Sequence, residues 1–219
     1  MTVYYSLYGQ LLDINNLYKG FKKVKAAKGA AGIDRQSIAA FALNLEENLK
    51  QLQGELQSKQ YRAQPVKRIE IPKDDGGVRL LGIPTVRDRI VQQTLLNILQ
   101  PLFDIDFHPS SYGYRPKRSC HDAISKATVF IRKYHREWVV DMDLSKCFDL
   151  LDHDLIISSV KRKVTDGSIL KLLKQFLKSG VMIGNNWEAS ELGSPQGGVI
   201  SPLLANIYLD AFAQEMKMR

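Results

Sequence analysis

Four aspartates stand close together in the stretch WVVDMDLSKCFDLLDH, residues 138–153. The apolar residues at its start favour a β-strand over 138–144, and alternation along such a strand would place Asp141 and Asp143 together on one face. A carboxylate where a strand ends can hold Mg²⁺ through oxygen, with water and phosphate oxygens completing the coordination. Two such ions can activate an attacking hydroxyl and stabilise a leaving oxygen. Metal-dependent phosphoryl transfer is therefore one chemistry that this segment could perform.

Each of these aspartates also has a structural interpretation. Asp152 and Asp154 flank a predicted helix start, where a carboxylate can cap free backbone amides. Asp149 could brace the turn before that helix, and Asp141 could form a salt bridge. For Asp143, periodicity alone does not decide between a metal ligand and a structural role.

A glycine-rich loop, GSPQGGVISP at residues 193–202, precedes a predicted helix near the end of the sequence. Free amides at a helix start favour a phosphate or another polar ligand. The loop does not match the P-loop pattern, because no Gly-Lys-Ser/Thr follows the glycines. Gln196 is an unusual choice for a simple turn, although tight packing could account for the glycines.

Apolar periodicity and capping residues predict the elements that would position these groups. Thr85 with Asp88, and Ser119 with Asp122, each predict a helix start. The pattern as a whole indicates an α+β fold in which helices outnumber strands, with no repeat and no clear domain boundary. Helices are predicted over 4–26, 37–58, 152–164 and 166–180, and three more are predicted to begin at 85, 119 and 201. The predicted strands form hairpins at 66–84 and around 183–187. The segment 138–144 is predicted as a single strand.

The charge distribution favours a polyanionic partner. Thirty-one Lys and Arg residues against 23 Asp and Glu give a formal charge of +8. Charge alone does not distinguish RNA, DNA and an acidic surface. Two segments combine basic and aromatic residues, YKGFKKVKAAKG at 18–29 and YGYRPKRS at 112–119. Either segment could be a solvated face, but two together favour nucleic-acid binding.

Composition excludes several other classes of protein. A hydrophobic fraction of 44% and a charged fraction of 25% are typical of a soluble globular protein. No apolar run approaches the roughly 20 residues that span a bilayer, and the N-terminus lacks the pattern of a signal peptide. We therefore expect a cytoplasmic protein with no membrane partner. Cys120 and Cys147 lie far apart and suggest neither a disulfide framework nor a zinc site.

Five stretches, taken in order, resemble successive sequence blocks of group II intron reverse transcriptases, also called maturases. They are GAAGIDRQS, IPKDDGGVRLLGIPTVRDRIVQQ, HPSSYGYRPKRSCHDAI, VVDMDLSKCFDLLDH and GSPQGGVISPLLANIYLD. The resemblance covers essentially the whole chain and implies a right-hand polymerase fold. It implies fingers at 1–135, including an N-terminal extension, and a partial palm with a finger insertion at 136–219. Thumb and maturase domains would be absent.

The resemblance also assigns a catalytic centre. Asp143 matches the first palm aspartate, which coordinates the catalytic Mg²⁺ ions, and Leu144 matches a position that offers its backbone carbonyl to a metal. Phe148 matches an aromatic gate that would clash with a ribose 2′-hydroxyl, the group that separates RNA from DNA building blocks.

Further residues match nucleotide-binding and template-binding positions. Lys73 and Arg79 match cations that hold the triphosphate, and a lysine and an arginine on facing strands can clamp a phosphate chain. Without the resemblance they would be exposed hairpin charges. The remaining dNTP-binding positions are the backbone amides of Lys146 and Cys147, and Gln196. The RNA- or template-binding positions are Lys22, Lys23, Lys25, Gly29, Gly32, Ile33, Arg115, Lys117 and Arg118.

One departure from the family limits the activity that we predict. The other palm carboxylates come from a Tyr-Ala-Asp-Asp block, which this sequence lacks; its only adjacent aspartates, Asp74 and Asp75, lie in the hairpin turn. We expect the parent protein to be an RNA-directed DNA polymerase that uses Mg²⁺ and dNTP and binds intron RNA, an RNA template and a DNA primer. We expect residues 1–219 to be inactive alone. The alternatives are a non-catalytic RNA-binding module and a retron-type, diversity-generating or CRISPR-associated reverse transcriptase.

Overall fold

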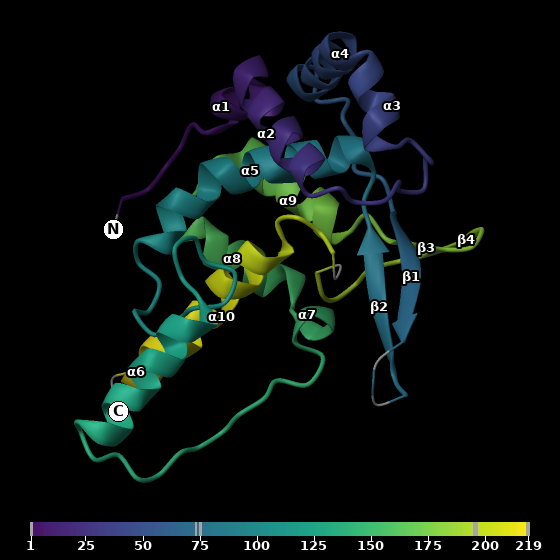
Figure 1. Ribbon diagram of the computed structural model, residues 1–219. Coiled ribbons are helices and arrows are strands. Elements are labelled where there is room, and N and C mark those ends of the chain that lie inside the picture. The colour runs from purple at the N-terminus through teal and green to yellow at the C-terminus, as the bar shows by residue number, and fades with distance from the viewer. Residues whose placement is uncertain (1, 73, 75, 195–196, 218–219) are drawn as a thin grey trace.

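The computed structural model describes residues 2–72, 74, 76–194 and 197–217 (Figure 1). Helices predominate over a small sheet, as the sequence predicts. The helices are α1 (Tyr8–Leu12), α2 (Ile14–Ala26), α3 (Ile38–Leu43), α4 (Leu45–Gln57), α5 (Val86–Asp104), α6 (Cys120–Arg132), α7 (Cys147–Leu150), α8 (His153–Lys161), α9 (Gly167–Leu177) and α10 (Ser201–Lys217). The strands are β1 (Val66–Pro72), β2 (Val78–Ile83), β3 (Val181–Ile183) and β4 (Asn186–Glu188).

Helix α5 forms the centre of the core. It crosses the upper half of the molecule in Figure 1, beneath α2 and above α8 and α10. Its first turn is capped by Thr85, whose hydroxyl accepts a hydrogen bond from the amide of Asp88. Helix α2 approaches α5 closely at Gly20, where any Cβ would collide with the side chain of Thr94. The small residue therefore fixes the spacing of the two helices.

Two long predicted helices are each broken once. The predicted helix over 4–26 becomes α1 and α2, because Asp13 is extended and caps the amide of Asn15. The predicted helix over 37–58 becomes α3 and α4, because Asn44 leaves the helical conformation. Helical periodicity continues across both breaks, so the apolar pattern alone does not reveal them.

The four strands form one sheet in the order β2-β1-β3-β4. Strands β1 and β2 are an antiparallel hairpin, with Lys67 opposite Ile83. Strand β3 lies parallel to β1, with Val66 opposite Val181, and β4 returns antiparallel to β3. Both predicted hairpins are confirmed. The sheet joins two hairpins that are nearly 100 residues apart in sequence.

The predicted strand over 138–144 is wrong. These residues are irregular and exposed, and Trp138 has 93% of its surface accessible. Figure 1 shows them in the long connection that leads away from α6 and back to α7. A strand needs a neighbour to satisfy its backbone groups, and no described strand pairs with this segment. The apolar face predicted from alternation, with Val140 and Met142, is therefore exposed as well.

The predicted boundary between residues 135 and 136 stays a prediction. Buried residues on both sides of that boundary belong to one hydrophobic cluster, for example Leu95 on α5 and Leu204 on α10. None of the helices in the described ranges carries an apolar stretch long enough to span a membrane.

Candidate active site

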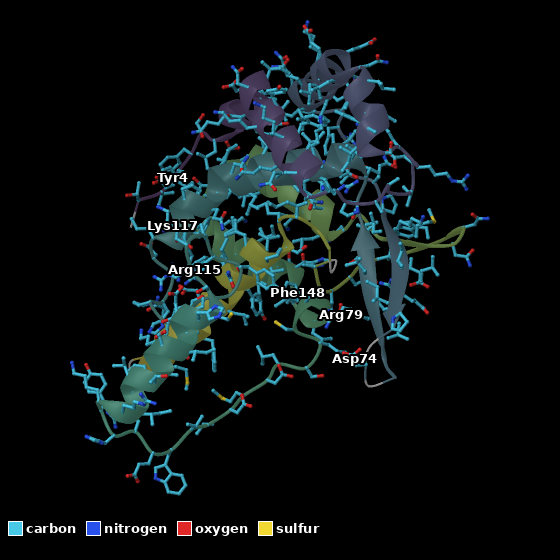
Figure 2. The ribbon with its side chains drawn as sticks, viewed as in Figure 1. Tyr4, Asp74, Arg79, Arg115, Lys117 and Phe148 are labelled. Carbon is cyan, nitrogen blue, oxygen red and sulfur yellow. The ribbon has the colours of Figure 1, made fainter. Side chains whose placement is uncertain are left out.

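An open cleft of about 870 Å³ lies between the β-hairpin and α7. Its walls come from β2, from the residues around α7, from Tyr114, and from the segment 197–202 at the start of α10. Figure 2 shows the two labelled side chains Arg79 and Phe148 near each other on β2 and α7. The cleft therefore collects groups from four separate parts of the sequence.

Five of the predicted catalytic and dNTP-binding residues line this cleft. They are Arg79, Asp143, Lys146, Cys147 and Phe148. Leu144 follows Asp143 but is not among the lining residues. Lys73 and Gln196 lie outside the described residues, so their predicted roles stay predictions.

Arg79 offers a positive charge to the cleft. It stands on β2 opposite Ile71, and its side chain is exposed. Its guanidinium takes part in none of the ion pairs found among the described residues. A guanidinium without a carboxylate partner is suited to bind phosphate oxygens in a two-pronged arrangement.

The residues around the start of α7 contribute a carboxylate and two backbone amides to the same cleft. Asp143 is exposed; partial burial of the Cys147 thiol, together with the negative charge of Asp143, raises the pKa of that thiol. Lys146 has left-handed backbone angles, φ 52° and ψ 37°, at the start of α7. The amides of Lys146 and Cys147 donate to no backbone group in the described ranges, which leaves them available to a ligand.

The carboxylates of the cleft fit magnesium only in part. Mg²⁺ is usually held by one or two carboxylates together with substrate phosphates and water. Asp143 is such a donor, and a nucleotide would bring the phosphates. Among the described residues, however, no group of three His, Cys, Asp or Glu side chains converges on one point. The described donor set thus suits one ion that arrives with a nucleotide, and does not by itself form a two-metal centre.

The segment 193–201 is attached to the walls of the cleft by hydrogen bonds. The amide of Gly193 donates to the carbonyl of Leu151 over 2.8 Å, and that of Ser194 donates to Phe148 over 2.7 Å. The ring Nε2 of the buried His153 donates to the carbonyl of Gly193 over 2.6 Å. Gly197 has φ +107°, and a Cβ there would collide with the carbonyl of Gly82 on β2. Glycine is therefore required where this segment meets the hairpin.

Three residues that line or support the cleft were not identified from the sequence. Tyr114 belongs to a segment that the sequence assigns to RNA, and the structure places its ring in the cleft. Gln92 and His153 form hydrogen bonds to Val199 and Gly193; both lie inside the quoted family blocks, but the sequence assigned no role to either. The interleaved aromatics of YGYRP were the available signal for Tyr114, while no local signal identifies the other two.

The predicted RNA-binding lysines form an exposed face on α2. Lys22, Lys23 and Lys25 are all exposed. The ammonium of Lys22 lies 4.6 Å from the ring centroid of Tyr18, and that of Lys23 donates to Asn97 over 2.6 Å. The face is available to a polyanion, and its role stays a prediction.

The loop after α2 packs on the start of α5. The guanidinium of the buried Arg89 donates to the carbonyl of Ala30 over 2.7 Å and lies against Gly29. At Gly32 a Cβ would stand 2.8 Å from the backbone of Thr85. These contacts explain both glycines by packing. Template contact by Gly29, Gly32 and the half-buried Ile33 stays a prediction.

The predicted template contact of Arg115 is not supported by its surroundings. The residue is only 7% exposed, and its Nε forms a 2.7 Å ion pair with Asp104. Its other nitrogens donate to the carbonyls of Asp104, His108 and Ser111. The guanidinium is thus used to hold the loop before α6. Lys117 and Arg118 are exposed nearby, and Figure 2 shows Arg115 and Lys117 on this loop.

The sequence of this chain matches a known protein family and several known proteins. Residues 71–219, about two thirds of the chain, match the family model described as reverse transcriptase (RNA-dependent DNA polymerase). The chain belongs to the reverse transcriptase family. The curated relatives of this reverse transcriptase domain include Protein YkfC of Escherichia coli (strain K12), 39% identical over 199 residues. They also include the Group II intron-encoded protein LtrA of Lactococcus lactis subsp. cremoris, 35% identical over 223 residues.

The relatives are longer than this chain. The matches cover 89% of the chain and 52% of YkfC, and 99% of the chain and 36% of LtrA. The chain thus spans about half or a third of these proteins. The resemblance to group II intron reverse transcriptases is confirmed.

A solved structure confirms the fold. A chain of a partial Cas6-RT-Cas1–Cas2 complex superposes on the reverse transcriptase domain with a TM-score of 0.60. The superposition covers 95% of this chain and 34% of that chain, at 22% identity. The reverse transcriptase family generally uses divalent metal ions, which agrees with an oxygen ligand such as Asp143 in the cleft.

Proposed function

We propose that this domain binds the incoming nucleotide in an RNA-directed DNA polymerase encoded by a group II intron. The reaction is attack of a primer 3′-hydroxyl on the α-phosphate of a dNTP, with pyrophosphate as the leaving group. The observation that carries the proposal is the cleft that joins Arg79 on β2 to Asp143 and Phe148 beside α7. A cation, a metal-binding carboxylate and an aromatic wall are what a magnesium–nucleotide complex requires.

Each residue of the cleft has a distinct task in this proposal. Arg79, with Lys73, binds the triphosphate, and the amides of Lys146 and Cys147 donate to its oxygens. Asp143, with the carbonyl of Leu144, holds Mg²⁺, which neutralises phosphate charge. Phe148 excludes a ribose 2′-hydroxyl. Gln196 lines the pocket near the sugar.

Equilibrium binding tests the proposal. Titration of the chain with dATP in Mg²⁺ should show saturable binding, weakened about tenfold or more by Arg79→Ala, because charge-assisted hydrogen bonds to phosphate are lost. Asp143→Ala should weaken binding in Mg²⁺ and have little effect in EDTA. The matched control is Arg132→Ala, an exposed arginine on α6 outside the cleft. Equal affinities for the Arg79 and Arg132 variants would refute the assignment of the cleft.

The exposed lysine face of α2 favours a second function, RNA binding without chemistry. Binding to intron RNA through Lys22, Lys23 and Lys25 should weaken steeply with salt, because phosphate contacts release counterions. Reversing these three charges to Glu should weaken RNA binding and flatten the salt dependence. The matched control reverses three charges on α9 and its C-cap, at Lys171, Lys174 and Lys178. If both triple variants lose affinity equally, the α2 face has no special role.

The proposed partners of the parent protein are intron RNA, an RNA template and a DNA primer, in the cytoplasm. Relatives such as LtrA support this class above a CRISPR-associated enzyme, because they match nearly the whole chain at 35% identity. The CRISPR-associated neighbour, at 22% identity, supports the fold alone.

A further inference from the structure

The ring of Tyr114 stands against the ring of Phe148 inside the cleft. Their centroids are 6.2 Å apart and their planes meet at 89°, an edge-to-face arrangement. Aromatic pairs favour this geometry because the positive edge of one ring meets the negative face of the other. Tyr114 is 69% exposed, so its ring stands in the cleft and does not fill the core.

The backbone that carries Tyr114 is held on both sides. Tyr114 itself has φ +55°, a conformation that is uncommon for residues other than glycine and persists where the surroundings impose it. On one side the carbonyl of Gly113 accepts a 2.9 Å hydrogen bond from Asn206 on α10. On the other side the buried Arg115 binds Asp104. The loop thus brings the tyrosine ring into the cleft from a fixed position.

The backbone of Phe148 is fixed as well. Its carbonyl accepts the 2.7 Å hydrogen bond from the amide of Ser194. The freedom that remains to this half-buried residue is rotation of its side chain. Tyr114 is the aromatic neighbour of that side chain within the described residues. Its ring therefore restricts the rotation of Phe148.

We infer that Tyr114 is a positioning residue for sugar discrimination, holding the ring of Phe148 where it excludes a 2′-hydroxyl. The inference rests on the proposed function of the cleft. Excluding a single hydroxyl requires the ring of Phe148 to stay in place. In close packing a change of even one methylene is felt, so a small shift of the ring would admit the hydroxyl. Tyr114 acts through Phe148 in this account and is not itself a catalytic residue.

The test compares dATP and ATP binding in Mg²⁺. Tyr114→Leu should lower the preference for dATP by about threefold to tenfold, the range expected for an aromatic pair, mainly through tighter binding of ATP. Tyr114→Phe keeps the ring and should keep the preference. Tyr134→Leu is the matched control, since it removes an exposed tyrosine that pairs with Phe130 on α6, outside the cleft.

A double-mutant cycle separates this inference from a general structural role. In a Phe148→Val background, Tyr114→Leu should have no further effect on the dATP-to-ATP ratio. A dATP-to-ATP ratio that is unchanged in Tyr114→Leu would overturn the inference, whether neither affinity changes or both fall equally. An equal fall would indicate that Tyr114 is a stacking surface for either nucleotide. Both of those results leave the proposed function intact. Failure of the unmodified chain to bind either nucleotide overturns both.

Discussion

The side-chain oxygen of Gln92 accepts a 2.8 Å hydrogen bond from the backbone amide of Val199 and lies 3.4 Å from the amide of Ile200. Gln92 is buried in the middle of α5, and the two amides belong to the segment that ends at the start of α10. The hydrogen bond thus connects the central helix of the core to the segment 197–202, which forms one wall of the cleft. It joins residues that are 107 positions apart.

Replacing Gln92 by Leu should destabilise the protein. Leucine has a similar size but no acceptor, so the amide of Val199 loses its partner. We expect the free energy of unfolding to fall by about 1–3 kcal/mol, measured by urea denaturation. Gln93→Leu is the control, because the neighbouring Gln93 donates to the side chain of Asn97, one turn away on the same helix. Equal stability of the Gln92 and Gln93 variants would contradict the role of Gln92.

Replacing Gly32 by Ala should also destabilise the protein, because the new Cβ would stand 2.8 Å from backbone atoms of Thr85, which cannot move aside as a flexible side chain would. We expect a loss of about 1–3 kcal/mol, as for overpacking of a core. Gly54→Ala provides the opposite case. A Cβ at Gly54, inside α4, meets nothing within 4 Å and should stabilise the helix by about 0.5–1 kcal/mol. Thermal melts that shift in the same direction for both variants would refute this explanation.

Asp166 should make stability depend on acid pH. Burial alone would raise the pKa of this carboxyl, but four amides donate to it, those of Leu7, Tyr8, Ser168 and Ile169, and they hold the pKa below its usual value. Because the folded pKa is the lower one, the contribution is complete above the unfolded pKa of roughly 3.9. It is lost as the pH falls through the folded value.

The measurement is the free energy of unfolding of the unmodified chain and of Asp166→Asn between pH 7 and pH 3. The difference between them should be largest at neutral pH and shrink as the pH falls. Asp13→Asn is the control, since Asp13 caps α2 through a single exposed hydrogen bond. A difference that stays constant over this range would show that the charge of Asp166 is not involved.

Local interactions explain which parts of the fold could be predicted. The caps at Thr85 and Ser119 and both hairpins depend on residues a few positions apart, and all of them are confirmed. The strand at 138–144 depends on pairing with a distant partner, which residue types near Trp138 do not reveal.

The candidate site was predictable to the extent that it follows family motifs. Arg79, Asp143 and Phe148 were named from the sequence, and the structure brings them into one cleft. The burial of Arg115 was not predictable, because an arginine beside Tyr114 and Lys117 in a basic segment has the composition of a nucleic-acid contact. Its partner Asp104 comes from the end of α5. Gln92 was missed for a different reason, because its partner lies 107 positions away.

Residues 1–219 should not extend a primer. Asp143 is the one carboxylate that the family motifs assign to metal binding in this chain, and one carboxylate holds two metal ions poorly. A primer-extension assay with a DNA primer on an RNA template, dNTPs and Mg²⁺ should give no product above background. Efficient extension by the purified chain that disappears in Asp143→Ala would contradict this prediction, because it would show that the described donor set is sufficient.

The central claim is that the cleft between β2 and α7 binds the nucleotide, and photo-crosslinking tests it most directly. The chain is irradiated with a photoreactive dATP analogue in Mg²⁺, with and without excess dATP, and modified peptides are identified by mass spectrometry. We predict modification confined to 73–83, 112–116, 143–150 and 196–202, and suppressed by dATP. Modification concentrated on α2 or α9, or unaffected by dATP, would contradict the claim.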